Sequence, residues 1–379
     1  MMKIVECLNL DYNATAPLRS IARAEALQAM DMAKGNPSSV HSFGRNARSM
    51  LENARTRIAE ALSIESKQIV FTSGATESNA MVIRGFKGPI LVSAIEHSSL
   101  LEARDDVTLA PVDENGVVLV SFIEKWLQEH QGHSLVSVMA ANNETGVVQP
   151  VDEIYALCKR TGASFHSDAV QAVGRIPLNL AHFDCISLSA HKLGGLSGVG
   201  CVIIKESFPL NALLRGGGQE RSYRSGTENI VGICAFSAAV EEAMSIEELN
   251  NWRNVEELRI MLEAELMTVC DDVRIIGKNA LRLANTTCIT MPNLKAETQV
   301  MRFDLEGIAV SAGSACSSGK IKKSRVLAAM GVPESIAKTA IRVSLSPKTT
   351  KQDIKRFISI WNDIYRSINH NDDKKVNAA

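Results

Sequence analysis

The sequence lacks an excess of charge of either sign. Its 379 residues contain 41 lysines and arginines against 42 aspartates and glutamates, so the formal net charge is −1 at pH 7. A strongly basic balance would favour a nucleic acid or an anionic membrane surface as the partner. We therefore expect no nucleic-acid binding and no membrane association.

Segments that would take the chain into or across a membrane are also missing. The longest apolar runs are shorter than the roughly 20 residues that a transmembrane helix needs. Met1-Met2-Lys3 leads directly into a strand-like segment, without the apolar stretch and small-residue cleavage site of a signal peptide. These absences predict a cytoplasmic location.

Common metal and nucleotide motifs are absent. The 8 cysteines form no CxxC pair and are too sparse for a disulfide framework. The sequence contains neither a GxxxxGKS/T loop nor a GxGxxG fingerprint. His130 and His133 lack the cysteine or carboxylate companions of a metal cage, so we place them on a surface loop. All cysteines except Cys316 suit small core positions.

What the sequence does contain is a regular alternation of apolar strand-like segments and helical patterns. The alternation predicts an α/β fold with a mostly parallel sheet covered by helices. Gly200–Ile204 follows the strand that ends near Leu188 after a short connection, so we expect it to run antiparallel. We expect the strand Leu135–Ala140 to end in a polar turn, Asn142–Gly146.

The length suggests two domains. We predict a large domain over residues 15–250 and a smaller α+β domain made of residues 1–14 together with 251–379. A helical pattern over residues 230–269, broken near Ser245, would link them. Further strands are predicted at 274–276, 287–291 and 309–311, and the polar tail from Asn369 is expected to fray.

Lys192 follows a buried strand and precedes a glycine-rich turn. Ligands of α/β proteins bind at strand ends, where an amine can form a Schiff base with a carbonyl. Taken alone, Lys192 could equally be a surface lysine. Similarly, the helix that opens at Ala75-Thr76 could bind an anion or could simply have an ordinary N-cap.

Polar groups follow several of the predicted strands and should therefore converge on one edge of the sheet. They are Thr76, His97, Asn143, Asp168, Gln171, Ser189, His191 and Lys192. Pyridoxal 5'-phosphate (PLP) needs such a set: a lysine for its aldehyde, a carboxylate for its pyridine nitrogen, and a helix start with hydroxyls for its phosphate. Strand-end aspartates are often only turn formers, so the combination matters more than any one residue.

Over nearly its whole length the chain resembles the cysteine desulfurases of the NifS/IscS type, which are fold-type-I PLP enzymes. The most specific blocks are Phe71–Asn79, Asn142–Gly146, His166–Gln171, Arg224–Asn229 and Gly313–Gly319, within a likeness that runs from Leu10–Thr15 to Ile341–Ser344. The resemblance implies a homodimer with PLP as cofactor and L-cysteine as substrate.

Residue roles follow from the resemblance by position. It implies that Lys192 is the Schiff-base lysine, that His97 stacks on the cofactor ring, and that Asp168 pairs with the pyridine nitrogen. Gln171 would contact the phenolic oxygen, and Asn143 would lie against the cofactor. The implied phosphate ligands are Ala75, Thr76, Ser189, His191 and, from the partner subunit, Thr227.

The resemblance also implies the substrate contacts and the nucleophile. Asn143 and Arg342 would hold the substrate carboxylate, Arg342 through a bidentate fork. Cys316 would attack the substrate sulfur as a thiolate, release alanine and carry a persulfide. Because no large apolar residue flanks Cys316, we expect its segment to be mobile and exposed. Freed Lys192 would remove the Cα proton, and His97 would carry the proton of the substrate thiol.

The implied partners are a sulfur acceptor or an iron–sulfur scaffold protein. No intrinsic metal site is expected, although Cys316 could be a transient iron–sulfur ligand with such a scaffold. The acceptor could serve iron–sulfur cluster assembly, nitrogenase maturation or tRNA thiolation. Other readings are a selenocysteine lyase, another fold-type-I PLP enzyme such as an aminotransferase, or a non-catalytic sulfur-relay or assembly protein.

The chain departs from the family near the lysine. Many relatives have a Gly-Pro-Lys-Gly turn where this chain has Gly195-Leu196-Ser197-Gly198, and Ala190 replaces a common glycine. Losing the proline frees the turn and losing the lysine removes a positive charge, so the loop geometry is left open.

Overall fold

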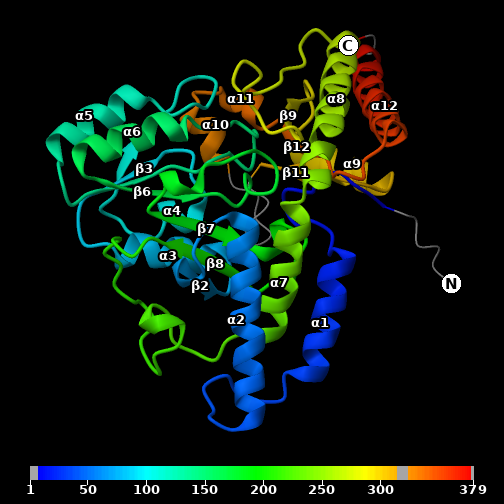
Figure 1. Cartoon of the computed structure of the whole chain (residues 1–379). Helices are drawn as coiled ribbons and strands as arrows, with labels where there is room; N and C mark the ends of the chain where they lie inside the picture. Colours follow the sequence, from blue (N-terminus) through cyan, green and yellow to red (C-terminus); the bar gives the residue numbers. More distant parts are fainter. Residues whose placement is uncertain (1–6, 314–322, 377–379) are drawn as a thin grey trace.

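A seven-stranded sheet lies at the centre of the computed structural model, which describes residues 7–313 and 323–376 (Figure 1). From edge to edge its strands are β2 (Ile69–Thr72), β8 (Gly200–Ile204), β7 (Cys185–Ser189), β6 (Ser164–Asp168), β5 (Leu135–Ser137), β3 (Ile90–Ser93) and β4 (Thr108–Ala110). β8 is antiparallel to both its neighbours, and the other pairings are parallel. The predicted α/β class and the antiparallel direction of β8 are confirmed.

Helices cover both faces of this sheet. They are α1 (Ser20–Met32), α2 (Ser42–Leu62), α3 (Ala75–Gly85), α4 (Ser98–Leu101), α5 (Val120–Glu129), α6 (Val151–Thr161) and α7 (Ile230–Ala243). Alternate strand residues point to opposite faces. Ile203 accordingly packs in a core with α2 and α7, whereas its neighbour Val202 packs in another with α3. In Figure 1, α1, α2 and α7 run side by side below the sheet.

A second, smaller sheet lies above α7 in Figure 1. It contains β11 (Ser311–Ala312), β12 (Ala340–Ser344) and β9 (Thr286–Thr290), all antiparallel, and beside it β1 (Leu8–Asn9) pairs with β10 (Ile308–Ala309). The helices here are α8 (Ile246–Val269), α9 (Ala296–Leu305), α10 (Arg325–Ala329), α11 (Glu334–Ala337) and α12 (Lys351–Val376). Leu10 and Tyr12 share a core with Trp252 and Trp361, whereas Leu327 packs in the core of the large sheet. The domain bounds of residues 15–250 and 1–14 with 251–379 stay a prediction.

The helical periodicity of α2 shows why sequence patterns worked well in this region. Its buried apolar residues include Ala47, Leu51, Ala54, Ile58 and Leu62, which recur every three or four positions and form one face. The predicted break at residue 245 is also confirmed, because the Ser245 side chain accepts a hydrogen bond from the Glu248 N–H and caps α8.

Two local predictions of strands were wrong. Residues 274–276 form no strand, since Ile275 makes a single isolated bridge with Ile289. The strand expected to reach Ala140 ends at Ser137. The backbone of α12 extends to Val376, into the tail from Asn369 that is expected to fray, and the fraying itself stays a prediction.

Two predictions about single side chains were also incomplete. Cys7 is exposed rather than part of the core. His130 and His133 do lie in the loop between α5 and β5, as predicted, but their rings also stack on Trp126 and Phe86.

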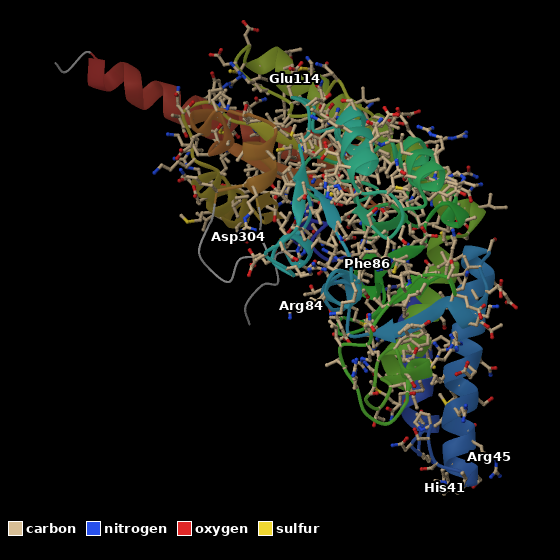
Figure 2. All side chains as sticks on the ribbon, turned by 90° about the vertical axis from the view of Figure 1, so that its left-hand side faces the viewer. His41, Arg45, Arg84, Phe86, Glu114 and Asp304 are labelled. Carbon is tan, nitrogen blue, oxygen red and sulfur yellow. The ribbon has the colours of Figure 1, made fainter. Side chains whose placement is uncertain are left out.

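Figure 2 shows that the molecule is elongated, with His41, which caps α2, and Arg45 of α2 at one end and Asp304 of α9 towards the other. Within the described ranges, no helix combines the length and the hydrophobicity that a membrane crossing requires.

A buried ion pair attaches the loop before α7 to the sheet. Glu220, in the short 3-10 helix Glu220–Ser222, receives hydrogen bonds of 2.8 and 2.9 Å from the Arg55 guanidinium of α2 and one of 2.7 Å from Phe71 N of β2. The two side chains are only 4% and 1% exposed. The Glu220 carboxylate therefore depends on Arg55 for charge compensation, whereas Arg55 also pairs with Glu52.

Arg55→Met should lower the free energy of unfolding by about 3–5 kcal/mol, because it leaves the Glu220 carboxylate buried without its cation. Arg57 of the same helix is the matched control. Its side chain is 30% exposed and pairs with Glu25 and Glu241, so Arg57→Met should cost about 1 kcal/mol or less. Urea unfolding of both variants checks this, and equal small losses would contradict it.

Candidate active site

The carboxyl ends of β6 and β7 bring two predicted site residues to the same edge of the large sheet. The strands are parallel neighbours, with Asp168 paired in register to Ser187, two residues before Ser189. β7 then passes into the 3-10 turn Ala190–Lys192, which carries His191 and Lys192. The expected convergence of strand ends is therefore present for these residues.

Lys192 and Gln171 meet at the backbone of Asn13. Lys192 Nζ donates to the carbonyl oxygens of Asn13 and Ala14 at 2.7 and 2.8 Å. Gln171 Nε2 donates to the same Asn13 oxygen at 3.1 Å. Within the described residues Gln171 Oε1 is buried without a hydrogen-bond partner, which leaves polar capacity at the site for a ligand.

Asp168 and His97 are connected through two side chains that the sequence analysis did not single out. Asn79 Nδ2 donates to Asp168 Oδ2 at 2.8 Å and to Ser99 Oγ at 2.9 Å. Ser99 Oγ lies 2.8 Å from His97 Nδ1, and Ser99 N–H also donates to that nitrogen. Asn79 belonged to the motif block Phe71–Asn79, so a signal for it existed; Ser99 had none beyond its closeness to His97.

The hydrogen bonds around His97 also define its neutral tautomer. A backbone N–H is always a donor, so Nδ1 accepts from Ser99 and the neutral ring carries its proton on Nε2. The Ser99 hydroxyl accepts from Asn79 and can donate to Nδ1.

The start of α3 forms a small-residue cradle beside Ser189. Gly74 has φ +148°, and a Cβ added to it would lie 3.7 Å from Ser189 Oγ. A Cβ on Gly200 would lie 2.8 Å from Gly74 Cα, so only glycine fits there. The free N–H groups of Ala75 and Thr76 in the first turn of this 11-residue helix suit a phosphate, and Thr76 is exposed to receive one.

His191, another predicted phosphate ligand, lies 3.0 Å from Thr15 Oγ1 through its Nδ1. Burial, aided by the charge of Lys192, lowers the pKa of His191 to about 4. The ring is therefore neutral at physiological pH, and it can serve a phosphate as a hydrogen-bond donor rather than as a cation.

Within the described residues, no hydrogen bond or ion pair of Thr227 connects it to this cradle. It is exposed on the loop before α7. The loop is nevertheless attached to α3, because Arg224 forms a 2.8 Å ion pair with Glu77 in the first turn.

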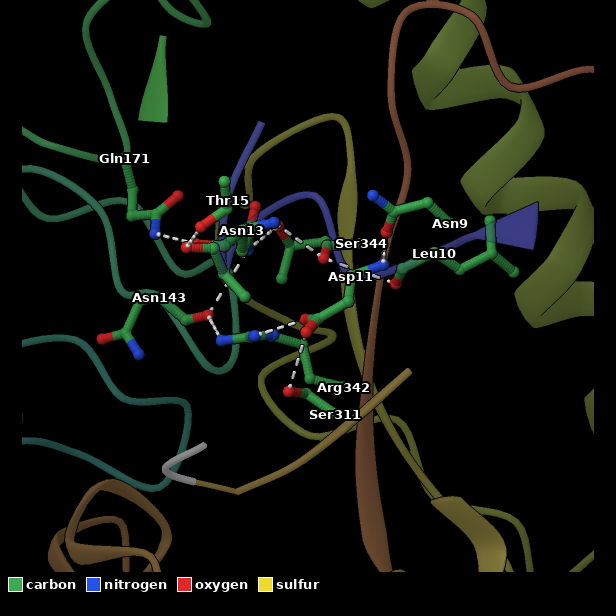
Figure 3. A network of polar contacts seen from close by, with 12 residues as sticks. Asn9, Leu10, Asp11, Asn13, Thr15, Asn143, Gln171, Ser311, Arg342 and Ser344 are labelled. Atoms are coloured by element: carbon green, nitrogen blue, oxygen red, sulfur yellow. Dashed lines mark hydrogen bonds and ion pairs between the residues drawn. The ribbon is translucent and has the colours of Figure 1, made fainter. Parts of the chain in front are cut away.

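Asn143 and Arg342 do meet, at the junction of the two sheets (Figure 3). Arg342 Nη1 donates to the Asn143 backbone carbonyl at 3.0 Å, and Nη2 forms a 2.6 Å ion pair with Asp11. Within the described residues the buried Nε of Arg342 has no hydrogen-bond partner. Figure 3 shows the Asn143 amide pointing away from this network. The pair can thus offer a guanidinium and an amide to an anion.

Asn13 holds these groups together and was missed as a site residue. Its side chain, fully buried, accepts from Arg175 Nη1 at 2.6 Å and from Asn285 Nδ2 at 3.1 Å. Its amide donates to Thr286 Oγ1 at 2.9 Å and to the Asn143 carbonyl at 3.3 Å. The block Leu10–Thr15 contained the residue, but nothing in the sequence indicated its partners.

The departures near the lysine have a packing explanation. Leu196 packs against a cluster of alanines from α1 and α7, including Ala22 and Ala239. Ala190 is fully buried. The loop is therefore held by apolar contact where many relatives have proline.

The expected nucleophile, Cys316, lies outside the described residues. Among the residues that are described, no group of three or more histidine, cysteine, aspartate or glutamate side chains could hold a metal ion.

Comparison with known proteins assigns the family. The model for aminotransferase class V matches residues 8–357. The cysteine desulfurase IscS of Dictyoglomus turgidum is 37% identical over 375 residues, which cover 95% of this chain and 94% of the relative. A cysteine desulfurase of Cereibacter sphaeroides is 38% identical over 373 residues, 94% of this chain and 95% of the relative. The X-ray structure of a NifS-like protein from Rickettsia africae has a TM-score of 0.87 and 38% identity, and the match covers 95% of this chain and 99% of that one. The chain therefore belongs to the aminotransferase class-V family, among the cysteine desulfurases of the IscS and NifS type.

Proposed function

We propose that this protein is a PLP-dependent cysteine desulfurase that converts L-cysteine to L-alanine and transfers the sulfur to Cys316. The observation that carries the proposal is one arrangement of side chains. Asp168 is the last residue of β6, and Lys192 follows the adjacent strand β7. Asn13 connects Lys192 to the Asn143–Arg342 pair. An amine, a carboxylate and an anion-binding guanidinium are what an amino-acid-converting PLP enzyme requires.

The residues present fit PLP. The glycine cradle at α3, with Ala75, Thr76, Ser189 and His191, would take the phosphate, and Asp168 would face the pyridine nitrogen. Gln171, Asn143 and the His97 ring would surround the rest of the cofactor. When bound, PLP supplies a carbonyl that links to amines and a ring that accepts electron density from the substrate Cα.

The protein side chains would divide the remaining work. The guanidinium of Arg342 and the amide of Asn143 would orient the substrate carboxylate. Lys192 Nζ would take the Cα proton, and the His97 imidazole would be the acid–base group for the proton of the substrate thiol. Asn79, bonded to both Asp168 and Ser99, would keep the Asp168 carboxylate and the His97 ring in fixed relative orientation.

Sulfur transfer then balances without an outside oxidant. The Cys316 thiolate forms an S–S bond with the substrate sulfur, and the sulfur–Cβ bond breaks with its electron pair left on carbon. That carbon takes up a proton, so the products are a persulfide and alanine.

We further propose a cytoplasmic homodimer in which Thr227 of one subunit completes the phosphate site of the other. The persulfide would pass to a sulfur acceptor or an iron–sulfur scaffold protein, with Cys316 as a possible ligand of the cluster during transfer. The relatives named cysteine desulfurase IscS support the transfer of sulfur to an acceptor protein.

Cys316→Ala should keep the visible absorbance of bound PLP but lose persulfide formation, because the variant retains Lys192 and lacks the thiolate. The measurement is alanine release from L-cysteine together with mass spectrometry of the protein. Cys7→Ala is the matched control, since Cys7 is exposed and should leave both readouts unchanged. Normal alanine release by Cys316→Ala would refute the nucleophile.

Lys192→Ala should lose the covalent attachment of PLP and lower alanine formation by about a thousandfold, as removal of a general base does. Borohydride reduction and peptide mapping should find the adduct at position 192 in the natural protein. In the control Lys205→Ala, which alters a lysine paired with Asp184, the adduct should remain at 192. An adduct at another lysine of the natural protein would overturn the assignment.

A further inference from the structure

Glu144 is a buried carboxyl next to the anion-binding pair, and the proposed mechanism leaves it without a role. It follows Asn143 in the polar turn after β5 and is 5% exposed. Its Oε2 accepts a 2.6 Å hydrogen bond from Ser324 Oγ. Burial raises the pKa of Glu144, opposed by this hydrogen bond and by the charges of Arg342 and His97. The carboxyl therefore lies within electrostatic reach of two proposed site residues.

Ser324 connects that carboxyl to α10. The same hydroxyl that donates to Glu144 accepts a 3.1 Å hydrogen bond from Leu327 N, so Ser324 is the N-cap of the helix. Side-chain capping and the contact with Glu144 thus depend on a single oxygen. The pair joins the polar turn of the large sheet to α10 through buried atoms.

The contact between Ser324 and Glu144 lies close in sequence to Cys316. In the sequence, Cys316 lies between Gly313 and Lys323. On the upstream side, Ser311 pairs in register with Arg342 and donates a 3.2 Å hydrogen bond to Asp11. On the downstream side, Ser324 bonds Glu144. Both flanks of the Cys316 segment are therefore bonded to residues that surround the substrate carboxylate site.

We propose that Glu144 is a positioning residue for sulfur transfer, which acts by holding Ser324 and with it the downstream flank of the Cys316 segment at the substrate site. The inference rests on the proposed desulfurase function. It separates two stages of the reaction. Removal of the Cα proton depends on Lys192, whereas S–S bond formation requires the Cys316 thiolate to reach the substrate sulfur. Loss of the Glu144–Ser324 contact should therefore slow the second stage more than the first.

Neighbouring ion pairs provide the control. Lys323–Glu334 joins side chains that are 80% and 68% exposed, and Arg325–Glu102 joins side chains that are 55% and 58% exposed. Solvent-exposed pairs contribute little to holding a backbone in place. Lys323→Ala changes the residue directly before Ser324 and should leave the reaction unchanged.

The experiment compares Glu144→Ala, Ser324→Ala and Glu144→Gln in PLP-loaded protein. The first two remove the hydrogen bond and should each slow single-turnover alanine formation about tenfold, the usual effect of losing one buried hydrogen bond to a carboxyl. Exchange of the cysteine Cα hydrogen with deuterated water should stay within about twofold of the natural protein. Glu144→Gln keeps an acceptor oxygen and should restore alanine formation. Amide hydrogen exchange at Leu327 should rise in the first two variants.

The double variant Glu144→Ala/Ser324→Ala should be no slower than Ser324→Ala, because that single change already removes both the Glu144 contact and the cap of α10. Equal losses of Cα exchange and alanine formation would overturn the proposal in favour of a general structural defect. Alanine formation at the natural rate in Glu144→Ala would overturn it too, while leaving the desulfurase assignment intact. Natural protein that forms no alanine would refute the proposed function instead.

Discussion

The hydrogen bonds of Asn13 are the interaction on which the rest of the site depends. Its backbone and side chain together use every donor and acceptor they have. The carbonyl accepts from Lys192 and Gln171, and the backbone N–H donates to Ser344 Oγ at 3.0 Å. The side-chain amide bonds groups from both sheets. Because the residue is fully buried, each of these bonds must be made or a polar group is left without compensation.

This dependence explains how a segment close to the N-terminus can organise residues far along the chain. β1 pairs with β10, and the adjoining Leu10 and Tyr12 pack in one core with residues of α8 and β12, which fixes the position of the turn that carries Asn13. Asn13 then connects Lys192, which follows β7, to Arg342 of β12. Its carbonyl accepts from Lys192, and its side-chain amide donates to the same Asn143 carbonyl that accepts from Arg342. The relative position of the amine and the guanidinium is thus fixed by a residue that belongs to neither strand.

The parts of the fold that are regular in sequence could be predicted, and the parts that depend on distant partners could not. α2 repeats its apolar residues at helical spacing, so its position follows from the sequence alone. β12 reads AIRVS, and although Arg342 was named as a site residue, the segment was not predicted as a strand. An arginine at the centre of a buried strand is accommodated here by its ion pair with Asp11, 331 positions earlier. Ser99 and Asn79 acquire their roles only when Asp168 and His97 come together. Motif likeness named the candidate residues, but the contacts that hold them in place are tertiary.

Two buried carboxyls near the site, those of Glu96 and Asp168, differ in the hydrogen bonds that they receive. Glu96, beside His97, is buried with a single hydrogen bond, 2.5 Å from Met139 N, and within the described residues its second oxygen has no partner. Burial and the nearby charge of Asp168 raise the pKa of Glu96 well above its usual range. Asp168 instead receives hydrogen bonds from Asn79 and Val170 N, one to each oxygen. Donors stabilise a carboxylate, whereas burial without donors favours the protonated acid. Burial without donors therefore favours a neutral Glu96, and a neutral Glu96 places no second negative charge behind Asp168, the carboxyl proposed to face the cofactor.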